Sequence, residues 1–247
     1  MAAAAPLTAA AYLKRLRALQ SDVEREKIQR YFKTGAGEYG AGDRFLGVRM
    51  GQLFALSREF VAMSPAEIEK LLDSPWHEGR AGGCSIMDKQ GRSARTPESR
   101  RMELYDLYLR RHDRINNWDL VDLAAPFVVG RYLFDKPRRP LLRLARSKNV
   151  WERRTAIVST SYFLRQGEVE ETFRIAELLI KDREDMIHKP LGGWIRHAGG
   201  KTGSPRLKEF LDKHAATMPR VALRYAIEHL TPARRAHYLG LAKATQD

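Results

Sequence analysis

The stretch WERRTAI, residues 151–157, places charged side chains on one side of a potential helix and small apolar side chains on the other. Three further stretches share this texture: NWDLVD at 117–122, IHKPLG at 187–192 and PRVALRYA at 219–226. The four stretches begin at residues 117, 151, 187 and 219, which are 34, 36 and 32 residues apart. Recurrence at this interval is typical of helix pairs that repeat along a chain.

Amphipathic segments lie between the later stretches, at about residues 170–181 and 205–214. In the first of these segments, Phe173, Ala176 and Ile180 recur at the spacing of one helix face. Strand-like alternation is nearly absent from the chain. We therefore predict an all-α fold in which inner and outer helices pair and stack into a HEAT-like solenoid. Because the spacing is irregular, a non-repeating helical bundle is the alternative.

Proline pairs mark where helices begin, because the first helical turn tolerates the missing N–H of proline. The pairs are Ser64-Pro65, Thr96-Pro97, Ser204-Pro205, Met218-Pro219 and Thr231-Pro232. Residues 79–101 are the least regular part of the chain and are rich in Gly and Arg. There we expect a weak helix at about residues 84–89, followed by an exposed basic connector.

The charge of the chain predicts a polyanionic partner. Among 247 residues, 44 Lys and Arg oppose 30 Asp and Glu, which gives a formal net charge of +14. Between Arg131 and Arg165, ten basic residues face only Asp135 and Glu152, so this stretch alone carries +8. Arg side chains on stacked helices can follow a phosphate backbone, and we therefore predict binding to duplex DNA. A basic surface that serves only solubility is the alternative.

The remaining composition predicts a soluble cytoplasmic monomer, nucleoid-associated if the protein is bacterial. Cys84 is the only cysteine, which excludes a disulfide framework and suits a reducing compartment. The first 11 residues lack the basic start of a signal peptide, and no run approaches the ~18 apolar residues of a membrane span. We expect residues 1–20 to form a partly flexible leader and first helix, and residues 21–247 to form one helical-repeat domain.

Trp118 and Asp122 form the constellation with the clearest chemical meaning. They are four residues apart, so on a helix they share a face. An aromatic ring beside a carboxylate is suited to a cation. Asp119 follows Trp118 directly, about 100° around the helix, so we expect it to point away and to matter less for this chemistry, although the sequence leaves the relative roles of Asp119 and Asp122 open. The alternatives are that Trp118 belongs to the core and that either aspartate caps a helix or pairs with an arginine.

Other reaction classes find no support in the sequence. There is no Gly-rich phosphate loop after a strand and no Gly-x-Ser-x-Gly motif. The seven histidines do not cluster at metal-ligand spacing. We therefore expect neither a metal site nor a cofactor.

The motifs together resemble the DNA alkylation repair family, the HEAT-like alkylpurine DNA glycosylases of the AlkD type. The similarity runs from about residue 31 to residue 239. It is carried by YFKTG at 31–35, GEYG at 37–40, DRFLGVR at 43–49, NNWDLVD at 116–122, WERRTAI at 151–157, MPR at 218–220 and LRYA at 223–226. The resemblance implies a curved, right-handed stack of helical repeats with DNA on its concave face.

The resemblance also implies an activity and residue roles. The family hydrolyses the N-glycosidic bond of cationic alkylated purines, such as 3-methyladenine and 7-methylguanine, without flipping the base. Its catalytic Trp and Asp fall on Trp118 and Asp122, and its phosphate-contacting Arg falls best on Arg154, with Arg153 adjacent. Further DNA contacts are expected within the matching motifs, at Tyr39, Lys189, Trp194, Arg220 and Arg224.

One motif departs from the family pattern. The family has His-Lys-Ala-Val-Gly-Trp, with a second active-site Trp, whereas this chain has HKPLGGW at 188–194. Gly193 therefore occupies the Trp position, and Trp194 is displaced by about 100° on a helix. The retained Trp118 and Asp122 favour an enzyme, whereas the displaced Trp194 favours a non-catalytic helical-repeat protein that binds DNA. A protein-interaction solenoid is a third alternative, which the net charge disfavours.

The charge predicts that duplex DNA binding weakens steeply with salt. Contacts to about six phosphates would lower the affinity by ~10³ between about 50 and 200 mM salt, because bound counterions are released. Fluorescence anisotropy of a labelled duplex across this range measures the slope. An affinity that stays flat would contradict phosphate contacts and favour the protein-interaction alternative.

Overall fold

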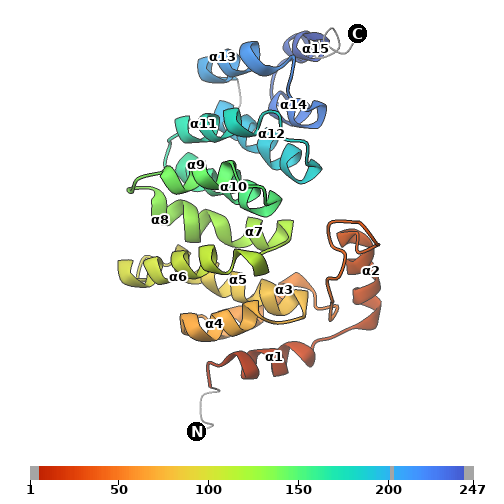
Figure 1. Cartoon of the computed structure of the whole chain (residues 1–247), viewed down its shortest axis with the longest axis vertical. Helices are drawn as coiled ribbons and strands as arrows, with labels where there is room; N and C mark the ends of the chain where they lie inside the picture. Colours follow the sequence, from red (N-terminus) through yellow and green to blue (C-terminus); the bar gives the residue numbers. More distant parts are fainter. Residues whose placement is uncertain (1–5, 201–202, 242–247) are drawn as a thin grey trace. The chain divides into compact units, whose positions relative to one another are not determined.

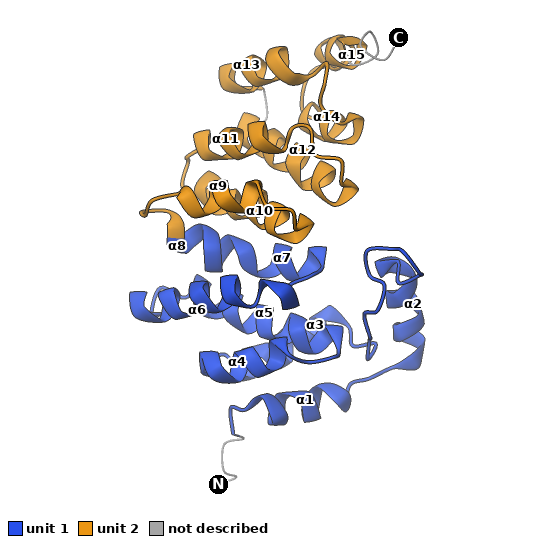
Figure 2. Ribbon diagram, in the orientation of Figure 1, with its two compact units in different colours: residues 1–132 blue, residues 133–247 orange. Residues whose placement is uncertain are grey.

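The computed structural model describes residues 6–200 and 203–241, which divide into two compact units (Figures 1 and 2). Unit 1 ends at Tyr132 and unit 2 begins at Leu133. Within the described residues all regular structure is helical, apart from one isolated bridge between Arg44 and Trp76. The predicted all-α fold is confirmed. None of the described helices has the length and apolar character that would let it cross a membrane.

Unit 1 is organised around its longest helix, α5. The elements are α1 (Ala9–Arg17), α2 (Asp22–Phe32), α3 (Met50–Glu59), α4 (Pro65–Leu72), α5 (His77–Arg92), α6 (Glu98–Arg110), a 3₁₀ turn (His112–Arg114), α7 (Trp118–Ala125) and a π-helical turn (Pro126–Gly130). Helix α5 packs against α1, α3, α4, α6 and α7. The expected first helix is α1, whose buried Tyr12 shares a 2.9 Å hydrogen bond with Ser57. Residues 1–5 of the expected leader lie outside the described residues.

Unit 2 contains paired helices in the predicted repeating pattern. After α8 (Arg131–Leu133), which spans the unit boundary, come α9 (Arg139–Ala145), α10 (Val150–Arg165), α11 (Glu170–Leu179), α12 (Asp185–Gly199), α13 (Pro205–His214), α14 (Arg220–Ala226) and α15 (Pro232–Leu241). Helix α12 packs between α10 and α14, and α11 packs against α9, α10 and α12. The stretches at 151–157, 187–192 and 219–226 thus belong to consecutively packed helices, and the segments at 170–181 and 205–214 form α11 and α13.

The dipeptides that end in proline lie at helix starts, although in two of them the proline occupies the cap position instead of the first helical position. Ser64 and Ser204 cap α4 and α13, and each side chain accepts a hydrogen bond from a backbone N–H in the first turn. At α6 the cap position is Pro97, because the Thr96 hydroxyl donates instead to the carbonyl of Gln90 at 2.7 Å. Pro219 likewise occupies the cap position of α14.

A helix is present at residues 84–89, as expected, but it is neither weak nor short, because the whole segment from His77 to Arg92 is one continuous and almost wholly buried helix, α5. Its glycines allow close packing. A Cβ at Gly82 would lie 2.5 Å from the Tyr12 hydroxyl, and one at Gly91 would lie 2.7 Å from the carbonyl oxygen of Phe127. Five neighbouring helices can therefore approach α5, and this packing outweighs the low helix propensity of glycine.

Two adjacent glycines in α12 offer a matched test of this packing. A Cβ at Gly192 would lie 2.2 Å from the backbone oxygen of Ala222 in α14, whereas a Cβ at Gly193 would meet nothing within 4 Å. We expect Gly192→Ala to lower the free energy of unfolding by about 1–3 kcal/mol through overpacking. Gly193→Ala should raise it by about 0.5–1 kcal/mol, because alanine favours a helix interior. Urea denaturation measures both changes, and equal effects of the two substitutions would contradict the close approach of α12 to α14.

Candidate functional site

The start of α7 is fixed by its cap, Asn117. The fully buried side chain of Asn117 accepts a hydrogen bond from the backbone N–H of Trp118 at 2.8 Å. Its amide nitrogen donates to Asp43 Oδ2 at 2.9 Å. Asn117 therefore joins α7 to a loop that lies 74 residues earlier in the chain.

A buried cluster of charges joins the first turn of α5 to α7 and to the same loop. His77 Nε2 lies 2.7 Å from Asp119 Oδ2, and His77 Nδ1 lies 3.5 Å from Asp43 Oδ2. Arg80 pairs with the other oxygen of Asp43. The side chains of His77 and Arg80 are 3% and 5% exposed, so both charges are almost fully removed from water. The four groups nearly balance one another, with two cations and two carboxylates, which is the condition under which buried charges are tolerated.

The cluster holds His77 in its charged form. Burial alone would lower the pKa of His77, but the charge and hydrogen bond of Asp119, together with Asp43, outweigh it and raise the pKa to about 9. Burial likewise opposes ionisation of Asp43, yet hydrogen bonding to His77 and the charge of Arg80 hold the pKa of that carboxyl well below its usual range. Near neutral pH the imidazolium is therefore paired with two carboxylates.

The next residue of α5, Glu78, holds the segment that follows the loop. Its buried carboxylate accepts hydrogen bonds from three successive backbone N–H groups, at Leu46, Gly47 and Val48, over 2.8–3.2 Å. Gly47 has a φ of 82°, and a Cβ there would lie 2.1 Å from the carbonyl oxygen of Ser21. The segment thus requires glycine at this position and places one wall of a cavity.

This cavity, of about 620 Å³, lies within unit 1 between α2, α3, α5 and α7. Most of its wall is apolar, formed by side chains that include Ile28, Tyr31, Phe32, Phe45, Phe54 and Leu123. Trp118, Asp119 and Asp122 line it from α7, and His77 and Glu78 line it from α5. The cavity therefore combines an aromatic wall with carboxylates from one helix face.

Trp118 is held by the aromatic side chains around it. Its ring stacks on Phe32, with centroids 5.3 Å apart and planes 17° from parallel, and meets the edge of Tyr31 at 5.8 Å. Tyr39 lies beside them and donates to the carbonyl of Tyr31 at 3.3 Å. Burial raises the pKa of Tyr39, although a hydrogen bond with Trp118 opposes this rise. The structure thus brings Tyr39 and Trp118, both assigned from the resemblance, into one neighbourhood.

The two aspartates of α7 differ in their surroundings. Asp122 is exposed at the cavity, whereas the side chain of Asp119 is only 12% exposed and pairs with His77. The expectation that Asp119 points away from the site is wrong, because Asp119 lines the same cavity as Trp118 and Asp122. Asp119 and Asp122 are three residues apart, and this spacing also shares a helix face.

Arg153 and Arg154 in unit 2 are both engaged within the protein. Arg153 pairs with Asp182 at 2.6 Å and donates to the carbonyls of Ser147 and Lys148. Arg154 is 7% exposed and donates to the carbonyl of Met186.

A proline explains why that carbonyl is available. In a regular α-helix the carbonyl of Met186 would accept from the N–H of residue 190, but α12 has Pro190 there. The Arg154 guanidinium therefore satisfies an acceptor that Pro190 leaves open.

The remaining predicted DNA contacts also lie in unit 2. Lys189 and Arg224 are exposed, and Arg220 donates to the carbonyl of Leu239 at 2.8 Å. Trp194, on α12, is half-buried and meets the ring of His197 edge-on, with centroids 5.9 Å apart.

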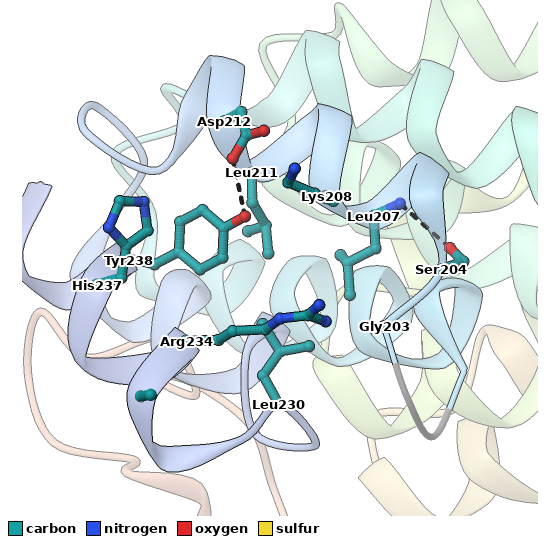
Figure 3. A pocket seen from close by; sticks show the side chains of 11 residues that line it. Gly203, Ser204, Leu207, Lys208, Leu211, Asp212, Leu230, Arg234, His237 and Tyr238 are labelled. Carbon is teal, nitrogen blue, oxygen red and sulfur yellow. Dashed lines mark hydrogen bonds between the residues drawn. The ribbon is translucent and has the colours of Figure 1, made fainter.

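A second cavity, of about 300 Å³, lies in unit 2 between α13 and α15 (Figure 3). Lys208, Arg234 and His237 lie around it, and the Tyr238 hydroxyl donates to Asp212 at 2.8 Å. Burial and the bond to Asp212 raise the pKa of Tyr238 to about 12. None of the predicted site residues lines this cavity. Within residues 6–200 and 203–241, no group of three His, Cys, Asp or Glu side chains is placed to hold a metal ion.

Comparison with known proteins shows to which family the chain belongs. The family model described as DNA alkylation repair enzyme matches residues 12–230. The chain belongs to this family. One similar solved structure is a predicted DNA alkylation repair enzyme from Enterococcus faecalis, with a TM-score of 0.65 at 16% identity over 86% of this chain and 97% of the other. No match is found among curated proteins. Family membership indicates a role in DNA alkylation repair, with DNA as the substrate.

Sequence reasoning missed the residues that position the site in this family member. Arg80 lies in the segment expected to be irregular, residues 79–101, His77 lies two residues before it, and Asp43 is part of a motif quoted only for the family resemblance. His77 and Asp119 are 42 residues apart, and Arg80 and Asp43 are 37 apart. The one local signal was the His-Glu-x-Arg pattern at residues 77–80, which places three ionisable groups in one helical turn.

The pairing of His77 predicts that the protein loses stability as the pH rises from about 6.5 to about 9. The pKa of His77 is raised on folding, so its contribution is fully present below 6.5 and is lost as the pH passes through 9. The loss should be about 3 kcal/mol. Urea denaturation between about pH 6 and pH 10 measures it.

His77→Gln is the control, because glutamine can donate to Asp119 but does not titrate. Its free energy of unfolding should change less over the same range. The same pH dependence in both proteins would contradict the charged state assigned to His77.

Proposed function

We propose that the protein is a DNA glycosylase that hydrolyses the N-glycosidic bond of cationic alkylated purines, such as 3-methyladenine and 7-methylguanine, in duplex DNA. The observation that carries the proposal is the placement of Trp118 and Asp122 on one helix, lining one cavity. Family membership supports a repair role, and the motif match at residues 116–122 supports this reaction.

Alkylation makes the purine positively charged and therefore a good leaving group, so the reaction needs no strong general acid. As the glycosidic bond breaks, positive charge develops on the sugar. The exposed carboxylate of Asp122 stabilises that charge more than it stabilises the ground state, which is the condition for catalysis.

Trp118 recognises the cationic base. The face of an indole ring attracts positive charge through its quadrupole. Stacking on Phe32 fixes the plane of the ring, so little conformational entropy is lost when the substrate binds. We propose that recognition proceeds without flipping the base, as the resemblance implies.

The duplex is held through its phosphates. Exposed Lys189 and Arg224 provide cations for these contacts, and Arg153, Arg154, Arg220 and Trp194 complete the proposed DNA-binding set. Phosphate contacts fix the register of the protein on the duplex and carry no sequence information.

A non-catalytic DNA-binding protein is the second candidate. The internal hydrogen bond of Arg154 and the displacement of Trp194 favour it, because both alter positions that the family uses. The two candidates differ in one result: the enzyme releases alkylated base from methylated duplex DNA above the spontaneous rate, whereas the binder does not.

Asp122→Asn tests the electrostatic role, since it removes charge and keeps size. We expect base release to slow by about 10²–10³-fold. Binding to undamaged duplex should change little or tighten, because a negative charge near the phosphates is removed. Single-turnover release of 7-methylguanine from duplex DNA measures the rate.

The matched control is Asp106→Asn, an exposed aspartate on α6 that does not line the cavity. It should release base at the wild-type rate. Wild-type rates for Asp122→Asn, with the fold intact by circular dichroism, would remove Asp122 from the mechanism. A wild-type protein that releases nothing would favour the non-catalytic candidate.

A further inference from the structure

A cluster of cations lies at the C-terminal end of α5, in unit 1. Its members are Arg58 of α3, Lys89 and Arg92 of α5, and Arg131 of α8. Burial lowers the pKa of Lys89, and the charges of Arg58 and Arg92 lower it further, although the charge of Asp88 opposes them. Cations from two helices therefore lie close enough together to act on one ammonium group.

The fold itself accounts for two of these cations. Arg92 pairs with Asp88 at 2.7 Å. Arg131 donates to the backbone carbonyls of the last two residues of α5, at 2.6 and 2.8 Å, where the helix dipole favours a positive charge. Within residues 6–200 and 203–241, Arg58 and Lys89 have no carboxylate partner of this kind. The end of α5 thus carries positive charge that the described residues leave unbalanced.

Two aromatic rings support the cluster without neutralising it. Lys89 Nζ lies 5.4 Å from the ring centroid of Phe54, and the guanidinium of Arg92 lies 3.9 Å from that of Phe127. A ring face attracts a cation and shields one side of it from water. Arg58 and Arg92 are exposed and Lys89 is half-buried, so an anion from solvent can reach all three. The lower dielectric beside the rings strengthens the attraction to that anion.

The cluster adjoins the cavity of unit 1. Phe54, which lies beneath Lys89, also lines the cavity that contains Trp118 and Asp122. Both features belong to one compact unit, whereas the cations proposed above for DNA belong to the other. An anion bound at Lys89 is therefore positioned relative to Asp122 by the packing of unit 1 alone.

We infer that Arg58, Lys89 and Arg92 form a site in unit 1 for a backbone phosphate of duplex DNA. The inference rests on the DNA binding in the proposed function, and it adds a contact that positions a strand beside the cavity. Guanidinium groups bind phosphate through paired N–H donors, and the ammonium group binds it as a point charge. The site carries no sequence preference, because every nucleotide presents the same phosphate.

Lys89→Met tests the site, because it removes the charge and keeps an unbranched side chain against Phe54. The dissociation constant for undamaged duplex should rise by about 10-fold, the effect of losing one charge-assisted contact. The log–log slope of affinity against salt should become shallower by about 0.9 between about 50 and 200 mM. Fluorescence anisotropy measures both quantities. Lys89→Arg retains the charge and should keep the wild-type salt slope.

Lys14→Met is the matched control. Lys14 is an exposed lysine of α1 in the same unit, and its charge is not among those that act on Lys89. The substitution changes the net charge by the same amount, yet the affinity should stay within about 2-fold of the wild type because distant exposed charges are screened. Equal weakening by the two variants would mean that net charge alone sets the affinity, and the inference would be overturned. Wild-type affinity and salt slope in Lys89→Met would also overturn it.

Lysine labelling examines the same site in the wild-type protein. An amine-reactive reagent should label Lys89 several-fold more slowly when duplex DNA is bound, whereas labelling of Lys14 should not change, as mass spectrometry of the peptides can show. Inorganic phosphate at the same concentration of phosphate groups should give no protection. Unprotected Lys89 in the complex, or equal protection by inorganic phosphate, would contradict a site for the DNA backbone.

Base release separates this site from the proposed function. If the wild-type protein releases no 7-methylguanine but Lys89→Met still weakens duplex binding, the glycosylase proposal is wrong and the phosphate site is supported. If the wild-type protein releases base and Lys89→Met binds duplex as the wild type does, the phosphate site is wrong and the glycosylase proposal is supported.

Discussion

The ion pair between His77 and Asp119 is the interaction on which the cavity of unit 1 depends. Moving an ion from water into a protein interior costs several kcal/mol, so a buried pair persists only where geometry and further hydrogen bonds compensate. Here Asp43 and Arg80 complete the compensation, and Asn117 joins Asp43 to the first residue of α7. Two segments that are distant in sequence, the loop with Asp43 and the start of α7, are thereby fixed to the first turn of α5. Removing one member would leave an uncompensated buried charge, which is more costly than losing the whole cluster.

The carboxylates that line the cavity differ in the partners that surround them. Glu24 is paired with Lys27 and Arg49, which lower the pKa of its carboxyl to about 2, and Asp119 is balanced by the imidazolium of His77. The carboxylate of Glu78 accepts hydrogen bonds from three backbone N–H groups. Asp122 is the exposed carboxylate on the helix that also carries Trp118. Asp122 therefore differs from these three carboxylates in its exposure to solvent at the cavity.

Local patterns were sufficient for the helices but not for the buried cluster. Helical periodicity identified α11 and α13, and the Ser-Pro pairs identified the starts of α4 and α13, because these signals lie within a few residues. The full length of helix α5 could not be predicted because its four glycines resemble loop residues, whereas five packed neighbours stabilise it. The contacts of His77 were missed because they join residues about 40 apart, and no periodicity encodes a pairing of that kind. Trp118 and Asp122 could be selected because i, i+4 spacing is local, but the cavity they line could not.

Pro190 in α12 affects the hydrogen bonding of Arg154, which belongs to another motif of the family pattern. By removing an N–H from α12, it leaves the carbonyl of Met186 open, and Arg154 of α10 donates to it. This hydrogen bond gives a part-buried carbonyl its donor, and breaking it opposes the use of Arg154 as a phosphate contact. In the proposed complex with duplex DNA, the register then depends more on cations that are already exposed, such as Lys189 and Arg224. The glycine that takes the family Trp position lies three residues after Pro190, in the same helix, so both departures from the motif arise from one altered segment of α12.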